Sequence, residues 1–339
     1  MRSMIYLLAL LLPILGGLAI FTQWKTRQIE ARNPPIGTFH DVGGYRLHAL
    51  HLLPDGAASS LPPVVFLHGA SGNLKDQYLA FGNALEGRAE LLFVDRPGHG
   101  YSERGGPEND LPSGQADAVA GLMASVGIDR AVVVAHSFGS AIAASLALQH
   151  PDKVAGLVFL APATHPWPGG VAWFYGAARS KLAGPVFTNL LSLPVGLGRV
   201  AEGTRCVFAP NVMPADYPDL TSPELVLRPR TFRANGTDVA NLNDYVRRVA
   251  PRYPEITAPT VIITGDRDSV VRPDIHSEGL ERDIAGAELV TIRNLGHKPD
   301  YIANDVAVAA IRKVAGEDID LQAMARAVEA RIANDDVRC

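Results

Sequence analysis

A serine, two aspartates and a histidine follow apolar stretches of this sequence, in positions where they could perform nucleophilic catalysis. His136 and Ser137 follow "AVVVA", Asp266 and Asp268 follow "VIITG", and His297 follows "LVTIRNLG". A serine hydroxyl is a weak nucleophile until a base takes its proton, and an imidazole oriented by a carboxylate is such a base. The order serine, acid, histidine therefore predicts serine-hydrolase chemistry if the fold brings the three groups together.

The apolar stretches before these residues are typical of strands buried on both faces. Short runs such as "PPVVFLHG", "ELLFVDRPGHG", "RAVVVAHS" and "VAGLVFLAP" alternate with segments that carry apolar residues at helical spacing. This alternation indicates an α/β fold with a mostly parallel, doubly wound sheet. Because ligands bind beyond the carboxyl ends of the strands in such sheets, we expect all the candidate residues at one edge.

One long segment interrupts the alternation. Residues 163–254 are rich in proline, glycine and aromatic residues, and they predict a helical lid inserted between two parts of the core, 37–162 and 255–339. A lid at this position would cover the site. Trp173 and Phe174 are therefore candidates for the wall of a substrate pocket, although aromatic clusters in helices more often belong to a core.

The N-terminal segment favours contact with a membrane. An uncharged apolar run from Met4 to Phe21 lies between Arg2 and Trp24, and it is long enough to span a bilayer as a helix. We therefore expect a membrane anchor over residues 1–24, followed by a proline-containing linker over residues 25–36. The chain would then be a single-pass membrane protein, with the lipid bilayer as a partner of its N-terminal helix.

Two other interpretations of this segment stay open. Gly17 and Ala19 have the spacing of a signal-peptide cleavage site, which would make the protein secreted or periplasmic, and a buried core helix is the third option. The side of the membrane is not decided, because basic residues after the run favour a cytoplasmic domain whereas the short N-terminal tail favours the opposite.

Composition excludes several classes of partner. With 31 basic and 35 acidic residues the net charge is −4, which argues against nucleic-acid binding.

The two cysteines, Cys206 and Cys339, make neither a disulfide framework nor a zinc site, and we regard both as incidental. His40, His48 and His51 lie in alternating strands without further ligands at metal spacing. We expect no metal and no cofactor.

These motifs together resemble the α/β-hydrolase-fold family, in the branch that includes esterases, haloperoxidase-like proteins and C–C bond hydrolases. The family's G-x-S-x-G turn appears here as A-H-S-F-G, with Ala135 in place of the first glycine. The resemblance implies that Ser137 is the nucleophile and His297 its base. It also implies that the backbone N–H groups of Ala70 and Phe138 form the oxyanion hole.

The acid of the triad has two candidates. The stretch "VFLAPATH" offers no carboxylate, which leaves Asp266 and Asp268 in "TGDRDSVV". Asp266 follows the strand directly and can accept backbone hydrogen bonds in the turn, whereas Asp268 lies further out, within reach of His297. Members of the family with the pattern G-D-x-D use the second aspartate, so the resemblance implies Asp268.

A serine nucleophile narrows the expected reaction. Relatives that open epoxides or displace halide use an aspartate, so Ser137 favours an acyl-enzyme route, with an apolar carboxylic ester or related acyl compound as substrate. The same triad would also suit a C–C bond hydrolase or a perhydrolase. In a different class, the chain would be a catalytically silent binding module, but such proteins usually lose one member of the triad.

Overall fold

A single mixed sheet forms the centre of the protein. The computed structural model describes residues 2–54, 59 and 61–339, with the backbone alone described at 2–5 and 7–11. Within these residues, eight strands pair in the order β1-β2-β4-β3-β5-β6-β7-β8. Their bounds are β1 Thr38–Asp41, β2 Arg46–Leu52, β3 Val64–Leu67, β4 Leu91–Val94, β5 Ala131–His136, β6 Val154–Leu160, β7 Thr260–Gly265 and β8 Glu288–Ile292. The pairs β1–β2 and β2–β4 are antiparallel and the others are parallel.

Both faces of the sheet are covered, because successive side chains of a strand point to opposite sides. Val65 and Leu67 of β3 pack in one apolar core with helices α3, α4 and α11, whereas Val64 and Phe66 pack in a second core with α2, α13 and α14. These helices are α2 Leu74–Leu85, α3 Pro112–Ser125, α4 Phe138–Gln149, α11 Pro273–Asp283, α13 Asn304–Val314 and α14 Leu321–Ile332. The predicted α/β fold with a mostly parallel sheet is confirmed.

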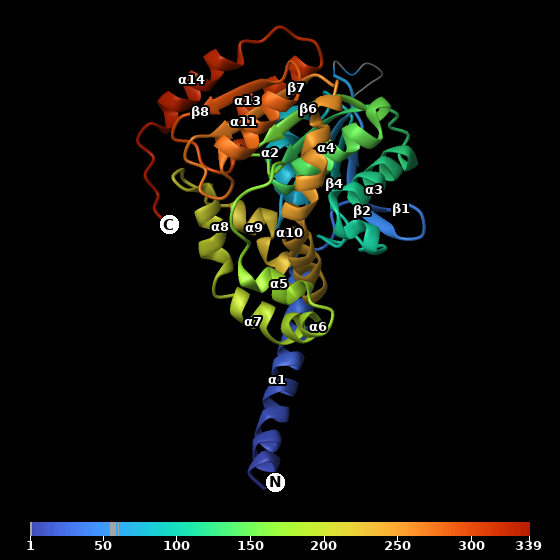
Figure 1. Cartoon of the computed structure of the whole chain (residues 1–339), viewed down its shortest axis with the longest axis vertical. Helices are drawn as coiled ribbons and strands as arrows, with labels where there is room; N and C mark the ends of the chain where they lie inside the picture. The colour runs from blue at the N-terminus through green and yellow to red at the C-terminus, as the bar shows by residue number, and fades with distance from the viewer. Residues whose placement is uncertain (1, 55–58, 60) are drawn as a thin grey trace.

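A group of helices between β6 and β7, here called the cap, lies at one end of the sheet (Figure 1). It corresponds to the predicted lid at residues 163–254. Its α-helices are α5 Trp173–Arg179, α6 Ala183–Phe187, α7 Leu193–Gly196, α8 Val200–Phe208, α9 Tyr217–Thr221 and α10 Pro229–Val249. A π-helical turn, η3 Thr188–Ser192, joins α6 to α7, and a 3₁₀ turn, η4 Pro223–Leu227, precedes α10.

Helix α1 (Arg2–Arg32) extends away from the rest of the molecule and leaves it on the cap side (Figure 1). The predicted linker at 25–36 takes a different form, because its first eight residues continue α1. This end of the helix is fixed to the cap: Ile29 is buried against Leu193 and Leu225, and Glu30 pairs with Arg228 at 2.9 Å.

In the part of the chain that the structure describes, no helix is long and apolar enough to cross a membrane. The predicted anchor, Met4–Phe21, falls partly outside that part, since the side chains of residues 4, 5 and 7–11 are not described.

The two cysteines form a disulfide between Cys206 of α8 and Cys339, which corrects the expectation that both are incidental. After α14 the chain turns back toward the cap, where the Val337 N–H donates to the Pro210 carbonyl at 2.8 Å. The sulfurs meet because of this return path. A sequence separation of 133 residues gives no sign of it.

Candidate active site

Ser137 occupies a sharp turn between β5 and α4. Its backbone adopts φ 52° and ψ −118°, a conformation that a non-glycine residue rarely takes. Small neighbours make the turn possible: a Cβ on Gly139 would lie 2.6 Å from the Leu67 carbonyl oxygen, and Ala135 is fully buried. The Ser140 hydroxyl closes the turn by donating to the Ala135 carbonyl at 3.0 Å.

The three predicted triad residues lie in one hydrogen-bonded chain. His297 Nε2 is 3.0 Å from the Ser137 hydroxyl, and His297 Nδ1 is 2.7 Å from Asp268 Oδ2. The three side chains come from the loops after β5, β7 and β8, and all three residues are buried. The parallel sheet therefore brings a hydroxyl, an imidazole and a carboxylate together at its carboxyl edge.

The two aspartates after β7 make different contacts. Asp266 accepts a hydrogen bond from the Asn294 N–H at 2.8 Å and so ties the β7 loop to the β8 loop. Asp268 faces the imidazole with one oxygen, and its other oxygen accepts from the N–H groups of Val270 and Val271. Burial raises the pKa of Asp268, but His297 and these backbone donors outweigh burial, and the net effect lowers the pKa.

The predicted oxyanion donors belong to two segments close to Ser137. Phe138 is the first residue of α4, where a helix has backbone N–H groups without partners inside the helix. Ala70 belongs to the loop after β3 and lines the same cavity as Ser137. This loop approaches the serine closely, since a Cβ on Gly69 would lie 3.1 Å from Ser137 Cβ.

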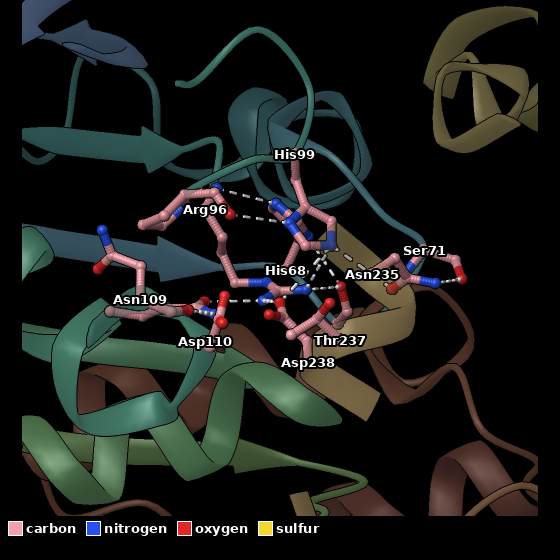
Figure 2. Close-up of polar contacts among 12 residues, drawn as sticks. His68, Ser71, Arg96, His99, Asn109, Asp110, Asn235, Thr237 and Asp238 are labelled. Carbon is pink, nitrogen blue, oxygen red and sulfur yellow. Dashed lines mark hydrogen bonds and ion pairs between the residues drawn. The ribbon is translucent and has the colours of Figure 1, made fainter. Parts of the chain in front are cut away.

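A buried ionic network joins that loop to the cap (Figure 2). Arg96, in the loop after β4, pairs with Asp238 of α10 at 2.9 Å, and both side chains are fully buried. Arg96 also donates to the Gly69 carbonyl at 3.2 Å, and its guanidinium lies over the Phe138 ring at 4.5 Å. Burial lowers the pKa of Arg96 to about 10, so the guanidinium stays charged at neutral pH. A single side chain thus contacts both predicted donor segments.

The cap also contacts this loop through Asn235 of α10. The Ser71 N–H donates to Asn235 Oδ1 at 2.8 Å, and Asn235 Nδ2 donates to the Ser71 hydroxyl at 3.0 Å (Figure 2). Ser71 is held at φ 61°, another unfavourable value for a non-glycine residue. The loop conformation around Ala70 therefore depends on a residue of the cap.

A second buried network surrounds Lys298, the residue after His297. Its ammonium group contacts Asp76 at 3.0 Å and Asp300 at 2.9 Å, and it lies over the rings of Phe208, Tyr217 and Tyr301. Burial lowers the pKa of Lys298, but the two carboxylates outweigh burial and the net effect raises it. The cap and the core meet at this network.

The residues around Lys298 include a set with metal-ligand spacing. Acceptor atoms of Asp76, His136 and Asp300 lie within 4.8 Å of one another. Lys298 already contacts both carboxylates, and its positive charge would repel a second cation there, so this set does not fit a metal ion. His136 has a structural contact instead, because its Nε2 lies 2.8 Å from the backbone carbonyl of His297.

A cavity of about 840 Å³ lies between the core and the cap, with Ser137 and His297 in its wall. This volume is toward the upper end of the ~300–1,000 Å³ common for ligand sites. Its walls are mainly apolar, and on the cap side they include residues from α5, α6, η3, α7, α8, α9, η4 and α10. Trp173 and Phe174 both line it, although the Trp173 side chain is largely exposed to solvent.

Sequence reasoning missed the polar residues that join the cap to the core. Asn235 and Asp238 are buried in α10, where the spacing of polar residues predicts an exposed face rather than a buried network. Lys298 could have been noticed in the sequence. A lysine directly after the histidine of a buried loop needs a carboxylate as partner. Its partner Asp76 lies 222 residues away and could not have been noticed in this way.

Comparisons with known proteins agree on one family. The family model described as alpha/beta hydrolase fold matches residues 62–299. Monoacylglycerol lipase abhd6-A of Xenopus laevis is 25% identical over 301 residues, covering 85% of this chain and 86% of the lipase. The 2-hydroxy-6-oxo-6-phenylhexa-2,4-dienoate hydrolase of Comamonas testosteroni is 25% identical, covering 69% of this chain and 80% of its own.

A solved structure described as a membrane phospholipase A, a novel bacterial virulence factor, superposes with a TM-score of 0.63. It is 21% identical and covers 94% of this chain and 100% of its own. At this level of identity, the similarity supports a shared fold only.

Proposed function

The chain belongs to the alpha/beta hydrolase fold family, and we propose that it is a serine hydrolase that cleaves carboxylic esters with an apolar acyl group. The observation that carries this proposal is the hydrogen-bonded chain from Ser137 through His297 to Asp268, which opens into a large apolar cavity. The lipases among its relatives support an ester substrate.

In the proposed mechanism, His297 Nε2 takes the Ser137 proton as the hydroxyl attacks the carbonyl carbon of the ester. Asp268 holds Nδ1–H and stabilises the imidazolium that forms. The backbone N–H groups of Ala70 and Phe138 donate to the developing oxyanion. The imidazolium then protonates the leaving alcohol, and a water activated by the same histidine releases the acid and regenerates Ser137.

The assignment of Ser137 makes a direct prediction. Ser137→Ala should abolish labelling by a fluorophosphonate and lower ester turnover by roughly 10⁴- to 10⁶-fold, because the nucleophile is lost. Ser145→Ala is the matched control, since Ser145 is buried in α4 and bonds Tyr245 instead. Turnover of p-nitrophenyl esters by purified Ser137→Ala at the wild-type rate would rule out the assignment.

We further propose that the chain is anchored to a membrane by the apolar run Met4–Phe21. The run is uncharged, and Leu12, Ile14 and Ile20 are exposed on α1. Retention of the full chain in membranes after a carbonate wash tests this proposal, because such a wash does not weaken apolar insertion. Recovery of a shortened chain that begins near Ile20 would indicate a cleaved signal peptide instead.

The disulfide supports a position for the catalytic domain outside the cytoplasm. Disulfides persist in oxidising compartments and are rare in the cytosol. The Cys206–Cys339 bond therefore favours the orientation in which α1 crosses the membrane and the cap faces the outer side.

A further inference from the structure

The first part of the cap carries many exposed apolar side chains. We call this surface the cap face; it comprises residues 171–195, which include α5, α6, η3 and the start of α7. Leu182 is 90% exposed and Trp173 is 76% exposed, and Val171, Val186 and Val195 are also exposed. Clustered apolar exposure of this kind is unusual for a protein surface that faces only water, and it marks an interaction site.

The charges within the cap face have one sign. The sequence contains no aspartate or glutamate between Ala161 and Ala201, whereas Arg179, Lys181 and Arg199 are all exposed there. An apolar surface whose own charges, Arg179 and Lys181, are both positive matches the chemistry of a bilayer with anionic headgroups. The surface of an ordinary soluble protein would carry both positive and negative charges.

The cap face lies beside the apolar run of α1. A groove of about 590 Å³ is lined by Leu15 and Leu18 of α1 and, on the cap, by Leu182, Ala183, Val186, Phe187, Leu190 and Leu191. Leu15 precedes Phe21 by about 9 Å along a helix. If the run lies in a bilayer as far as Phe21, α6 must enter the same bilayer, at the ~5–10 Å depth typical of interfacial segments.

The groove and the active-site cavity share a wall. Phe187 and Leu191 line both of them. The two side chains therefore separate a groove open toward α1 from the cavity that contains Ser137. Movement of these two side chains would connect the bilayer with the cavity without exposing an acyl chain to water.

We propose that the cap face is buried in an anionic lipid bilayer and that the groove admits the acyl chain of a membrane lipid to Ser137, with Phe187 and Leu191 as the gate. This inference rests on the proposed ester hydrolysis and on the proposed anchor. The substrate class is a bilayer lipid with a long acyl ester. Its cleavage consumes one water and releases a fatty acid and the remaining lipid alcohol.

The test uses the full chain reconstituted in vesicles of phosphatidylcholine, alone or mixed equally with phosphatidylglycerol. Two activities are measured: release of fatty acid from the vesicle lipid, and turnover of a water-soluble short-chain p-nitrophenyl ester. Leu182→Asp should lower the first by more than about tenfold, because a charge is placed at interfacial depth, and leave the second within about twofold. Lys181→Glu should also lower the release of fatty acid, but only from the mixed vesicles, because only these contain anionic headgroups.

Val212→Asp is the matched control. Val212 is also exposed but lies in the connection between α8 and α9, outside the cap face. Unchanged vesicle-lipid hydrolysis in Leu182→Asp would overturn the inference. So would conversion of a wild-type dimer to a monomer by the same variant, with lipid hydrolysis retained, since the cap face would then be a contact between two copies.

The outcomes separate the inference from the proposed function. A wild-type chain that turns over neither substrate contradicts the proposed function itself. A chain that turns over the soluble ester but never the vesicle lipid leaves the proposed function standing and overturns this inference alone.

The gate has its own test. Phe187→Trp should thicken the shared wall and lower the ratio of lipid turnover to short-ester turnover by more than about threefold. Phe232→Trp is the control, because Phe232 lines the active-site cavity but not the groove. The same ratio in both variants would exclude a gate at Phe187.

Discussion

At the scale of single residues, Ser137 illustrates how the fold holds a strained conformation. A non-glycine residue with positive φ costs on the order of 1–3 kcal/mol. The turn is fixed from both sides, because the Ser137 N–H donates to the Leu160 carbonyl and the Ser137 carbonyl accepts from the Ala163 N–H. The strained turn directs the hydroxyl toward His297, which is 3.0 Å away.

Mutations of the two aspartates after β7 should have different effects. Asp268→Asn should keep the local geometry but favour the wrong imidazole tautomer, with a loss in kcat of up to about 10⁴. Asp266→Asn should weaken the contact with the Asn294 N–H and lower the free energy of unfolding by about 1 kcal/mol, with turnover nearly unchanged. Measuring kcat and melting temperature for both variants tests the assignment. A large rate loss in Asp266→Asn alone would reverse it.

His276 predicts a dependence of stability on pH. Its Nδ1 accepts hydrogen bonds from the N–H groups of Thr164 and His165, which requires a neutral ring. Burial, with a further contribution from His165, lowers its pKa to about 4. Between that value and the ordinary 6.5, the unfolded chain binds the proton and the folded one does not. The stabilisation is therefore complete above about pH 6.5 and decreases by up to about 3 kcal/mol as the pH falls to about 4.

Urea unfolding at about pH 7.5 and about pH 5 measures this effect. Other buried histidines, His68, His99 and His136, also have a lowered pKa and contribute in the same direction. The comparison is therefore between wild type and His276→Gln, whose free energy of unfolding should change less between the two conditions. Equal changes in both proteins would contradict the prediction.

At the scale of elements, the cap covers the carboxyl edge of the sheet and also contributes to the geometry of the candidate active site there. Helix α10 contacts the loop that carries Ala70 directly through Asn235 and Ser71. It also contacts this loop through Arg96, which pairs with Asp238 and donates to the Gly69 carbonyl. A shift of α10 would therefore displace a predicted oxyanion donor. We therefore propose that seating of the cap is coupled to ordering of the predicted oxyanion hole.

Asn235 is accordingly predicted to be a positioning residue. Asn235→Ala removes both contacts with Ser71 and should lower kcat by about ten- to a hundredfold, as expected for a donor that moves by about an ångström. Asn241→Ala is the matched control, since this residue of α10 bonds Asp110 and Arg179 instead. Steady-state kinetics on a short ester separates kcat from KM. A change confined to KM would show that Asn235 only contacts the substrate.

The order of the core elements was predictable because the parallel strands β3, β4, β5, β6 and β7 are continuous apolar runs that alternate with helical segments. The positions of Asp266 and Asp268 relative to the strand end, together with the family pattern G-D-x-D, led to the prediction that Asp268 is the acid. Sequence reasoning failed where tertiary contacts override local pattern: residues 25–32 continue α1 because Ile29 packs on the cap, and α10 buries polar residues because they pair with Arg96 and Ser71.

At the scale of the whole molecule, the last turns of α1 and the C-terminal segment are both attached to the cap. The last turns of α1 pack on α7 and η4, and the C-terminal segment is joined to α8 through Cys206–Cys339. Helix α8 contributes Val200, Thr204 and Val207 to the wall of the active-site cavity. The disulfide therefore restrains one wall of the proposed substrate site, far along the sequence from the triad.

Removal of this bond should loosen α8 and leave the sheet intact. The bond closes a long loop, and such cross-links contribute about 2–5 kcal/mol, mainly by restricting the unfolded chain. Cys339→Ser should therefore lower the melting temperature, speed hydrogen exchange in α8, and broaden the range of acyl lengths accepted, while the kcat for a short ester stays nearly constant. Treatment of the wild type with a reductant should reproduce these changes, and the reductant should have no further effect on Cys339→Ser. Two free thiols in wild-type protein purified without reductant would contradict the prediction, because the bond would then be absent in solution.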